Sequence, residues 1–393
     1  MLRISLLATA FYFSILSSFS QNVGRTDSAY QARRLKFEEV NFLTSYYHQE
    51  GNNAAVTGGI GSEKLSDFAT TIDIKLTKRD RRNRLHTFSG EIGIDYYTSA
   101  SSDKVDPLTI SSASSNDVRV YPSLSWSVTN EEKKHTFGAT AAVSTEYDYL
   151  STGAGVSFSK DSKDNNRQFT ARLQTYIDFV TIIYPVELRP GPESGQQPRN
   201  TYSGSFSLSQ IINKRLQVAM IADVALQQGY LSLPFNRVYF NDSSHGVETL
   251  PDVRFKLPLG IRASYFMGDR VIIRAFYRYY TDDWGLQAHT INLETPIKIT
   301  PFISVSPFYR FYKQSAMDYF APYEIHAPSE TYFSSDYDLS KFTSHFSGIS
   351  FRVVSPDGVF KIPHLNTLEV RYGHYDRSTG LVSNIITLQA KLK

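Results

Sequence analysis

The chain has 393 residues, a formal net charge of +3 and no cysteine. The lack of cysteine excludes disulfide frameworks, thiolate zinc sites and cysteine nucleophiles, and the near-neutral charge argues against a nucleic-acid-binding protein, which needs a concentrated basic face. No apolar run reaches the 18 residues of a membrane-spanning helix, so a helical membrane protein is also excluded.

The first twenty residues have the layout of a cleavable secretory signal. Arg3 gives a positive start, residues 4–16 are apolar apart from Ser and Thr, and Ser18 and Ser20 form a small-x-small exit before Gln21. We therefore expect residues 1–20 to be removed on export. Residues 21–393 are expected to form one domain outside the cytoplasm.

From residue 68 onward the chain alternates between apolar and polar residues. Phe68, Ile72 and Leu76 share one parity, whereas Asp73 and Lys75 share the other. Repetition every two residues is the period of a β-strand, and no window of similar length fits an amphipathic helix better. The same alternation recurs in the segments 88–96, 120–128, 137–143, 171–179, 216–226, 259–265, 271–279 and 386–392.

The alternating segments are long. Strands of soluble sandwiches are typically about five or six residues, whereas a tilted strand that crosses a membrane needs about nine to eleven. Tyr and Phe, 26 of each, gather near the segment ends, as in the aromatic girdles of membrane barrels. This pattern predicts an all-β fold, a transmembrane antiparallel β-barrel.

We predict about sixteen strands, within a range of fourteen to eighteen, and an even number is typical of closed bacterial barrels. The expected strands are 40–49, 65–78, 84–98, 118–130, 133–148, 151–160, 167–183, 200–212, 214–228, 253–267, 270–283, 285–299, 300–313, 340–355, 365–376 and 381–393. The long connections follow odd-numbered strands, and most of those after even-numbered strands are short and polar. This asymmetry is typical of outer-membrane barrels, with long outer loops and short periplasmic turns.

Charged residues occupy the parity opposite to the apolar one. A charge facing lipid costs several kcal/mol, so these side chains are expected to line the lumen. Four of the arginines lie on three neighbouring strand segments and could select anionic solutes. The alternative is that each arginine pairs with a carboxylate and braces the wall. The predicted lumen-lining residues are Arg172, Asp178, Arg262, Arg274, Arg278, Arg310, Arg352, Glu369 and Arg371.

The predicted loop from Gln314 to Leu339 is acidic. Its carboxylates could bind calcium, which takes six to eight oxygen ligands, but their spacing is not that of an EF-hand. A solvated outer loop is the simpler interpretation, and neither a metal nor a cofactor is expected. The metal candidates are Asp318, Glu330, Asp336 and Asp338.

A His-x-Ser pair at His345 and Ser347 resembles that of outer-membrane phospholipases, in which the histidine accepts the serine proton. Both residues share the parity of Ile349 and would face lipid. The phospholipase pattern continues with Asn, whereas Gly348 follows here, and no residue that orients the imidazole can be assigned. Catalysis by this pair is kept as an alternative to a non-enzymatic role.

Several distinctive segments together resemble DUF3570, an uncharacterised family of outer-membrane proteins of Gram-negative bacteria. The resemblance covers most of the mature chain. It implies a β-barrel in the outer membrane and supplies no activity. The segments are Phe37–Tyr47, Asn52–Gly59, Tyr277–Gly285, Pro307–Ala316, Asp318–Tyr323 and Ser334–Ser340.

We therefore predict a barrel in the outer membrane of a Gram-negative bacterium that passes or binds small solutes through an arginine-lined lumen. One alternative is a structural barrel with a closed lumen that docks an envelope protein. The other is a lipid-active enzyme that uses His345 and Ser347. Outer-membrane lipid and small solutes are the expected partners, and nucleic acid is not.

Overall fold

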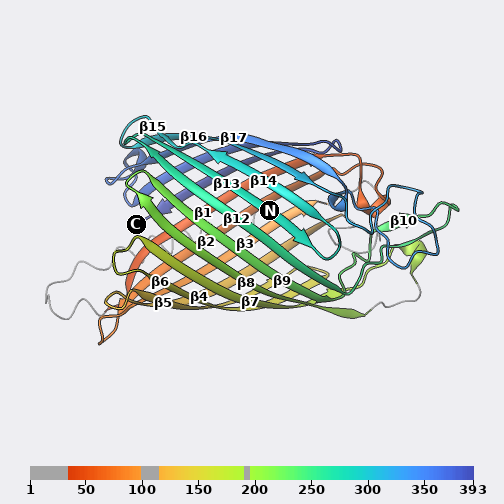
Figure 1. Cartoon of the computed structure of the whole chain (residues 1–393), viewed down its shortest axis with the longest axis horizontal. Coiled ribbons are helices and arrows are strands. Elements are labelled where there is room, and N and C mark those ends of the chain that lie inside the picture. The colour runs from red at the N-terminus through yellow and green to blue at the C-terminus, as the bar shows by residue number, and fades with distance from the viewer. Residues whose placement is uncertain (1–33, 99–114, 190–194) are drawn as a thin grey trace.

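The computed structural model describes residues 34–98, 115–189 and 195–393, and the expected signal peptide lies outside these residues. A single antiparallel sheet closes on itself through pairing of β1 with β19. The resulting barrel is seen from the side in Figure 1. The wall strands are β1 (Lys36–Glu50), β2 (Leu65–Arg79), β3 (Leu85–Thr98), β4 (Asn116–Asn130), β5 (His135–Thr145), β6 (Tyr149–Asp161), β7 (Arg167–Thr181), β8 (Gln196–Asn213), β9 (Leu216–Gly229), β12 (Val253–Met267), β13 (Val271–Asp282), β14 (Gln287–Glu294), β15 (Ile297–Lys298), β16 (Ile303–Gln314), β17 (Phe342–Val354), β18 (Leu365–Arg377) and β19 (Val382–Leu392).

β14 and β15 are two parts of one wall strand, because both lie between β13 and β16. The interruption falls at Thr295 and Pro296, where proline lacks the N–H that a continuous ladder would need. The wall therefore has sixteen strands, and the predicted antiparallel barrel is confirmed. β8 begins at Gln196, four residues earlier than predicted, because a polar segment without apolar alternation pairs there with the end of β7.

The outer face of the wall is apolar. Large side chains that alternate along the strands are widely exposed, among them Leu124 (69%), Met220 (61%) and Val156 (58%). A continuous belt of this kind is unsuited to water and matches the hydrocarbon layer around a membrane barrel. None of the helices in the described ranges is long and apolar enough to cross a membrane.

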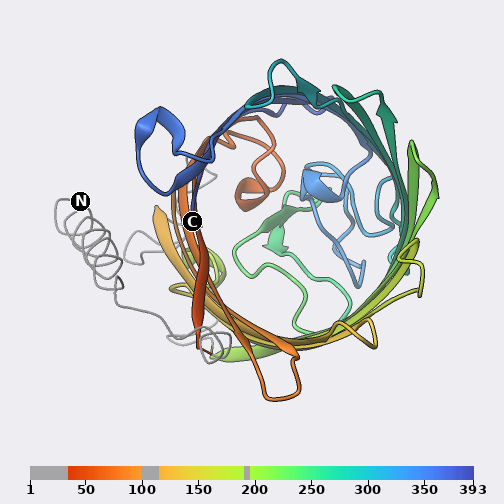
Figure 2. The same cartoon turned by 90° about the vertical axis from the view of Figure 1, so that its left-hand side faces the viewer.

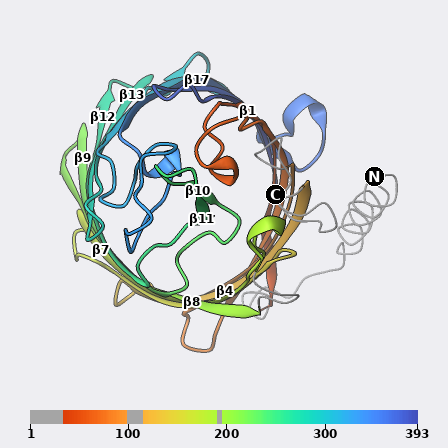
Figure 3. The same ribbon diagram turned by 90° about the vertical axis from the view of Figure 1, so that its right-hand side faces the viewer.

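The two clusters of buried apolar residues involve the loops at one end of the barrel. We call residues 51–64, 230–252 and 315–341 the mouth loops. They contain the short helices η2 (Ala55–Thr57) and η4 (Tyr337–Leu339) and the hairpin of β10 (Arg237–Tyr239) and β11 (His245–Val247), which lie inside the ring of strands (Figures 2 and 3).

Packing and hydrogen bonds join the mouth loops to one another. Leu250, Trp284 and Met317 form one apolar cluster. Arg237 donates to the carbonyl oxygen of Val56 at 2.8 Å, which joins the second mouth loop to the first. Because these contacts link segments far apart in the chain, the mouth loops form a structured body within one end of the barrel.

The two ends of the barrel differ as predicted. At the end opposite the mouth loops, most connections are turns of a few residues, such as the one through Gly268, whose φ of +64° favours glycine. The exception is the ten-residue connection after β17, which contains the short helix η5 (Val359–Lys361). We call this end the turn end and the other the loop end.

Candidate functional site

Nine charged residues were predicted to line the lumen, and all nine lie on wall strands at positions that alternate with exposed apolar residues. Arg310, for example, lies next to Tyr309, which is 43% exposed on the outer face. Arg310 lines a cavity of 520 Å³ together with Val56 and Phe235 of the mouth loops, which places its side chain on the inner face. Whether any of the nine contacts a solute stays a prediction.

Four of the arginines come together, although they belong to three different strands. Arg262 of β12, Arg274 and Arg278 of β13, and Arg310 of β16 line one cavity of 780 Å³. We call them the guanidinium cluster. The other side chains in this lining are mostly polar or aromatic, with one carboxylate: Ser264, Ala275, Phe276, Thr290, Asn292, Glu294, Tyr312, Phe342, Ser344 and Tyr375.

The arginines divide into paired and unpaired groups. Arg274 lies 3.3 Å from Glu294, and Arg278 lies 3.5 Å from Asp223. Arg352 lies 3.9 Å from Glu369. These side chains are partly exposed, so each pair contributes at most about 1 kcal/mol. The alternative role, an ion pair that braces the wall, therefore applies to Arg274, Arg278 and Arg352 among the predicted lumen-lining residues.

Arg262, Arg310 and Arg371 have no carboxylate within 4.0 Å among the described residues, and aromatic rings hold them instead. Their guanidinium carbons lie 5.7 Å from the ring centroid of Phe276, 5.7 Å from that of Phe346 and 4.0 Å from that of Phe308, respectively. Contacts of this kind contribute about 0.5–2 kcal/mol and leave the N–H groups free to donate.

The rings in turn lie over glycines of adjacent strands. A Cβ atom built on Gly373 would be 2.5 Å from the Phe346 ring, and one on Gly348 would be 2.5 Å from the Phe308 ring. Only glycine leaves room for a ring at these positions. Glycine therefore positions the ring, and the ring positions the arginine.

Asp178 and Arg172 lie on β7, apart from the guanidinium cluster. The Asp178 side chain is buried and accepts a hydrogen bond from the Tyr149 hydroxyl at 2.5 Å. Its Oδ1 has no hydrogen-bond partner within the described ranges. Arg172 forms no ion pair within the described part of the chain.

His345 and Ser347 both point outward, on the same face of β17 as Ile349. The Nδ1 atom of His345 lies 2.7 Å from the Tyr309 hydroxyl of the adjacent strand. No hydrogen bond joins His345 to Ser347 in the described residues. The imidazole of His345 therefore has Tyr309 as its partner and is not placed to accept a proton from Ser347.

The four carboxylates predicted as metal candidates do not come together as a set of ligands in the described residues. Glu330 contacts His326 at 2.6 Å, and Asp338 contacts Arg377 at 2.5 Å. Asp336 accepts a hydrogen bond from the Asp338 amide, and Asp318 packs against Gly285.

A different group of three carboxylates lies at the loop end of β4 to β6. One oxygen each of Asp117, Glu146 and Asp148 lies within 4.8 Å of the others, and this is the only such group in the residues that the structure describes. Burial, and the charges of Asp117 and Glu146, raise the pKa of Asp148 to about 6. The sequence analysis missed this group because Asp117 belongs to β4, whereas Glu146 and Asp148 belong to the turn between β5 and β6.

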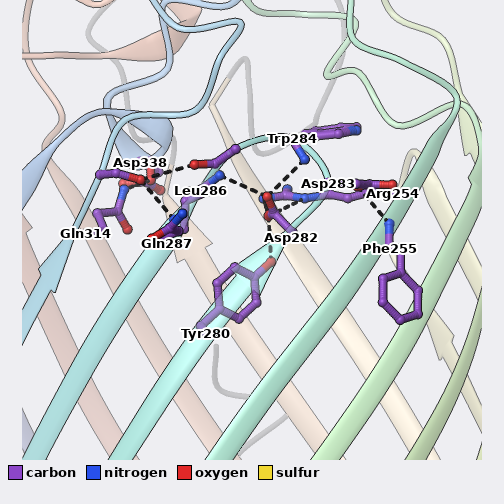
Figure 4. A network of polar contacts seen from close by, with 12 residues as sticks. Arg254, Phe255, Tyr280, Asp282, Asp283, Trp284, Leu286, Gln287, Gln314 and Asp338 are labelled. Atoms are coloured by element: carbon purple, nitrogen blue, oxygen red, sulfur yellow. Dashed lines mark hydrogen bonds and ion pairs between the residues drawn. The ribbon is translucent and has the colours of Figure 1, made fainter.

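Asp282, the last residue of β13, has a fully buried side chain that organises the following turn (Figure 4). Its carboxylate accepts hydrogen bonds from the Arg254 side chain at 2.5 Å and from the Tyr280 hydroxyl at 2.8 Å. The amides of Trp284 and Leu286 also donate to it. Asp282 thus fixes the hairpin of β13 and β14 against β12.

Three solved structures are similar to this chain over most of its length. The bacterial polysaccharide outer membrane secretin is 10% identical over 90% of this chain and 98% of its own, with a TM-score of 0.45. A BenF-like porin from Pseudomonas fluorescens Pf-5 is 8% identical over 90% and 98%, with a TM-score of 0.44. OpdK from Pseudomonas aeruginosa, solved with vanillate, is 7% identical over 90% and 97%, with a TM-score of 0.43.

No curated protein matches the sequence. Residues 83–379 match the family described as a protein of unknown function, DUF3570. This match spans more than half of the chain and confirms the resemblance found in the sequence, and the protein therefore belongs to the DUF3570 family.

Proposed function

We propose that this protein is exported to the outer membrane of a Gram-negative bacterium, where small solutes bind in its lumen and pass through it. The guanidinium cluster contacts their anionic groups. The observation that carries this proposal is the 780 Å³ cavity, whose lining contains four arginines and a single carboxylate, Glu294.

The unpaired arginines support the anion contact most strongly. Arg262 and Arg310 lie on aromatic rings and have no carboxylate within 4.0 Å among the described residues, so their N–H groups are available to a carboxylate or phosphate oxygen. A charged surface in a low-dielectric enclosure also concentrates ions of the opposite sign.

The cavity continues toward the mouth loops. Arg310 and Tyr375 line both the 780 Å³ cavity and the 520 Å³ cavity, and the second is also lined by Val56, Phe235 and Asp336 of the mouth loops. This shared lining supports a route that runs from the loop end to the guanidinium cluster.

The test is single-channel recording in planar bilayers under a KCl gradient. We expect discrete conductance steps with a reversal potential that indicates anion preference. The double variant Arg262→Gln/Arg310→Gln should shift that potential toward cations, and Arg81→Gln/Arg82→Gln, which removes two exposed turn arginines, should not. Absence of steps for the wild-type protein would overturn the proposal.

A structural barrel with a closed lumen is the second candidate, and the packing of the mouth loops inside the ring favours it. Glu248 of one loop accepts a hydrogen bond from Ser334 of another at 2.6 Å, and both residues are buried. This candidate predicts no conductance for the wild-type protein and steps only after the mouth loops are released.

A further inference from the structure

A second charged cluster lies on the inner wall away from the arginines. Asp67 and Asp73 of β2 and Glu91 and Asp95 of β3 alternate with the exposed apolar residues of these strands. We call them the carboxylate cluster.

No cation lies within 4.0 Å of any of these four carboxylates in the described ranges. Asp73 accepts a hydrogen bond from the Asn41 amide at 3.1 Å, and Asp95 accepts one from the Tyr121 hydroxyl at 2.9 Å. Both donors are neutral. A buried carboxylate oxygen of Asp67 has no hydrogen-bond partner among the residues that the structure describes. The nearest cations on this wall pair with other carboxylates, Arg119 with Glu146 and Lys75 with Glu39, so the four carboxylates have no ion-pair partner in the described part of the chain.

The strand order places the two clusters on opposite sides of the lumen. Seven wall strands separate β3 from β13 in either direction around the barrel, and seven separate β2 from β12. Glu91 and Asp95 thus lie across the axis from Arg274 and Arg278. Asp67 and Asp73 lie across it from Arg262.

The clusters also lie at a similar depth. Each wall residue is paired with a residue of the next strand, and these pairs can be followed around the barrel. From Glu91 through β4 to β12, the pairs lead to a position just past the loop end of β13. Following them through β2, β1 and β19 leads just before its turn end. Because barrel strands are tilted, the paired residues move toward one end of the barrel in one direction and toward the other end in the opposite direction. The β13 residue at the same height along the barrel axis as Glu91 therefore lies midway between these two positions. That midpoint is Phe276, which stands between Arg274 and Arg278 in the sequence.

We propose that the lumen selects small zwitterions, solutes that carry an ammonium at one end and a carboxylate at the other. Unpaired carboxylates on one wall and guanidinium groups on the opposite wall produce an electric field across the lumen, and a dipolar solute lowers its energy by aligning with that field. This inference rests on the proposed function, because it names the class of solute that passes.

The test is swelling of liposomes that contain the full-length protein, in solutions of glycylglycine or N-acetylglycinamide. The two probes are similar in size, but glycylglycine is a zwitterion at pH 7 and N-acetylglycinamide is neutral. We expect glycylglycine to enter at least about threefold faster, as electrostatic attraction to a charged channel predicts.

The variant Asp73→Asn/Glu91→Gln should reduce the glycylglycine rate to about that of the neutral probe and leave the neutral probe unchanged. The control Glu132→Gln/Asp269→Asn removes two exposed turn carboxylates and should leave the ratio of the two rates as in the wild-type protein. The heat-dependent shift in electrophoretic mobility verifies that each variant is a folded barrel.

The outcomes separate the two proposals. If neither probe enters, the proposed function fails. If N-acetylglycinamide enters but glycylglycine is no faster, or if the carboxylate variant keeps the wild-type ratio, solute passage stands and selection of zwitterions is wrong.

Discussion

Arg377 of β18 donates to the carboxylate of Asp338 in η4 at 2.5 Å, and this contact joins a wall strand to a mouth loop. The Arg377 side chain is 3% exposed and lies 3.8 Å from Glu63 of another mouth loop. Its guanidinium also lies 5.0 Å from the Phe342 ring centroid. One buried arginine therefore holds two mouth loops against the inner wall.

Arg377→Gln should release these loops. Loss of a hydrogen bond between charged groups costs about 1.5–3 kcal/mol, although solvent around the exposed Asp338 reduces this. We expect faster cleavage of the mouth loops by an added protease and larger conductance steps in bilayers. Arg215→Gln, in an exposed turn, is the control, and equal cleavage of both variants would contradict the role of Arg377.

Asp282→Ala should destabilise the barrel by about 3–5 kcal/mol, because it leaves the buried Arg254 guanidinium without its counter-charge. Asp282→Asn should reduce the free energy of unfolding by less, since its side-chain amide oxygen still accepts hydrogen bonds from the Trp284 and Leu286 amides. The measurement is the free energy of unfolding in urea, followed by tryptophan fluorescence in lipid vesicles. Asp283→Ala, which removes one hydrogen bond to the Phe255 amide, is the matched control.

Asp148 should make stability depend on pH. Its pKa is raised from 3.8 to about 6 by burial and by the neighbouring Asp117 and Glu146. The folded state therefore favours the protonated form, and this contribution is present below about pH 4 and is lost as the pH rises through 6. Tyr97 and Arg119 contact Glu146 and complete the charged surroundings.

The corresponding variant is Asp148→Asn. It should be more stable than the wild-type protein at pH 8, by up to about 3 kcal/mol, and the difference should shrink toward pH 4. Urea unfolding at a series of pH values measures this, with Asp269→Asn as the control. A constant difference across the series would rule out titration of Asp148.

Gly373→Ala should disturb the guanidinium cluster without breaking the wall. The new methyl would meet the Phe346 ring at 2.5 Å and Ile385 at 3.2 Å, and both neighbours are side chains that can move. Displacing the ring removes the surface on which Arg310 lies. We expect reduced anion preference in bilayers with normal folding yield, whereas Gly90→Ala, whose methyl would meet Leu124 at 3.4 Å, should leave the preference unchanged.

The sequence was sufficient for the wall. Alternation is a local property, since each side chain points away from its two neighbours, so the residues from Phe88 to Tyr96 could be divided into outward and inward sets without knowledge of any partner strand. The strand count and the difference between the two ends followed from the same local pattern. That Arg262, Arg274, Arg278 and Arg310 would lie close together followed from their position on nearby strands.

The loops and the charge pairing depended on the tertiary structure. The segment from Asp318 to Asp338 was expected to be a solvated loop, yet His326 is 3% exposed and Ser334 is fully buried, because the neighbouring mouth loops cover them. The sequence left open which carboxylates pair with the lumen arginines, and the closed barrel places Glu91 and Asp95 on the wall opposite Arg274 and Arg278. Such relationships depend on the order, tilt and closure of all sixteen strands, which bring together residues distant in sequence, and alternation within a single strand carries no information about them.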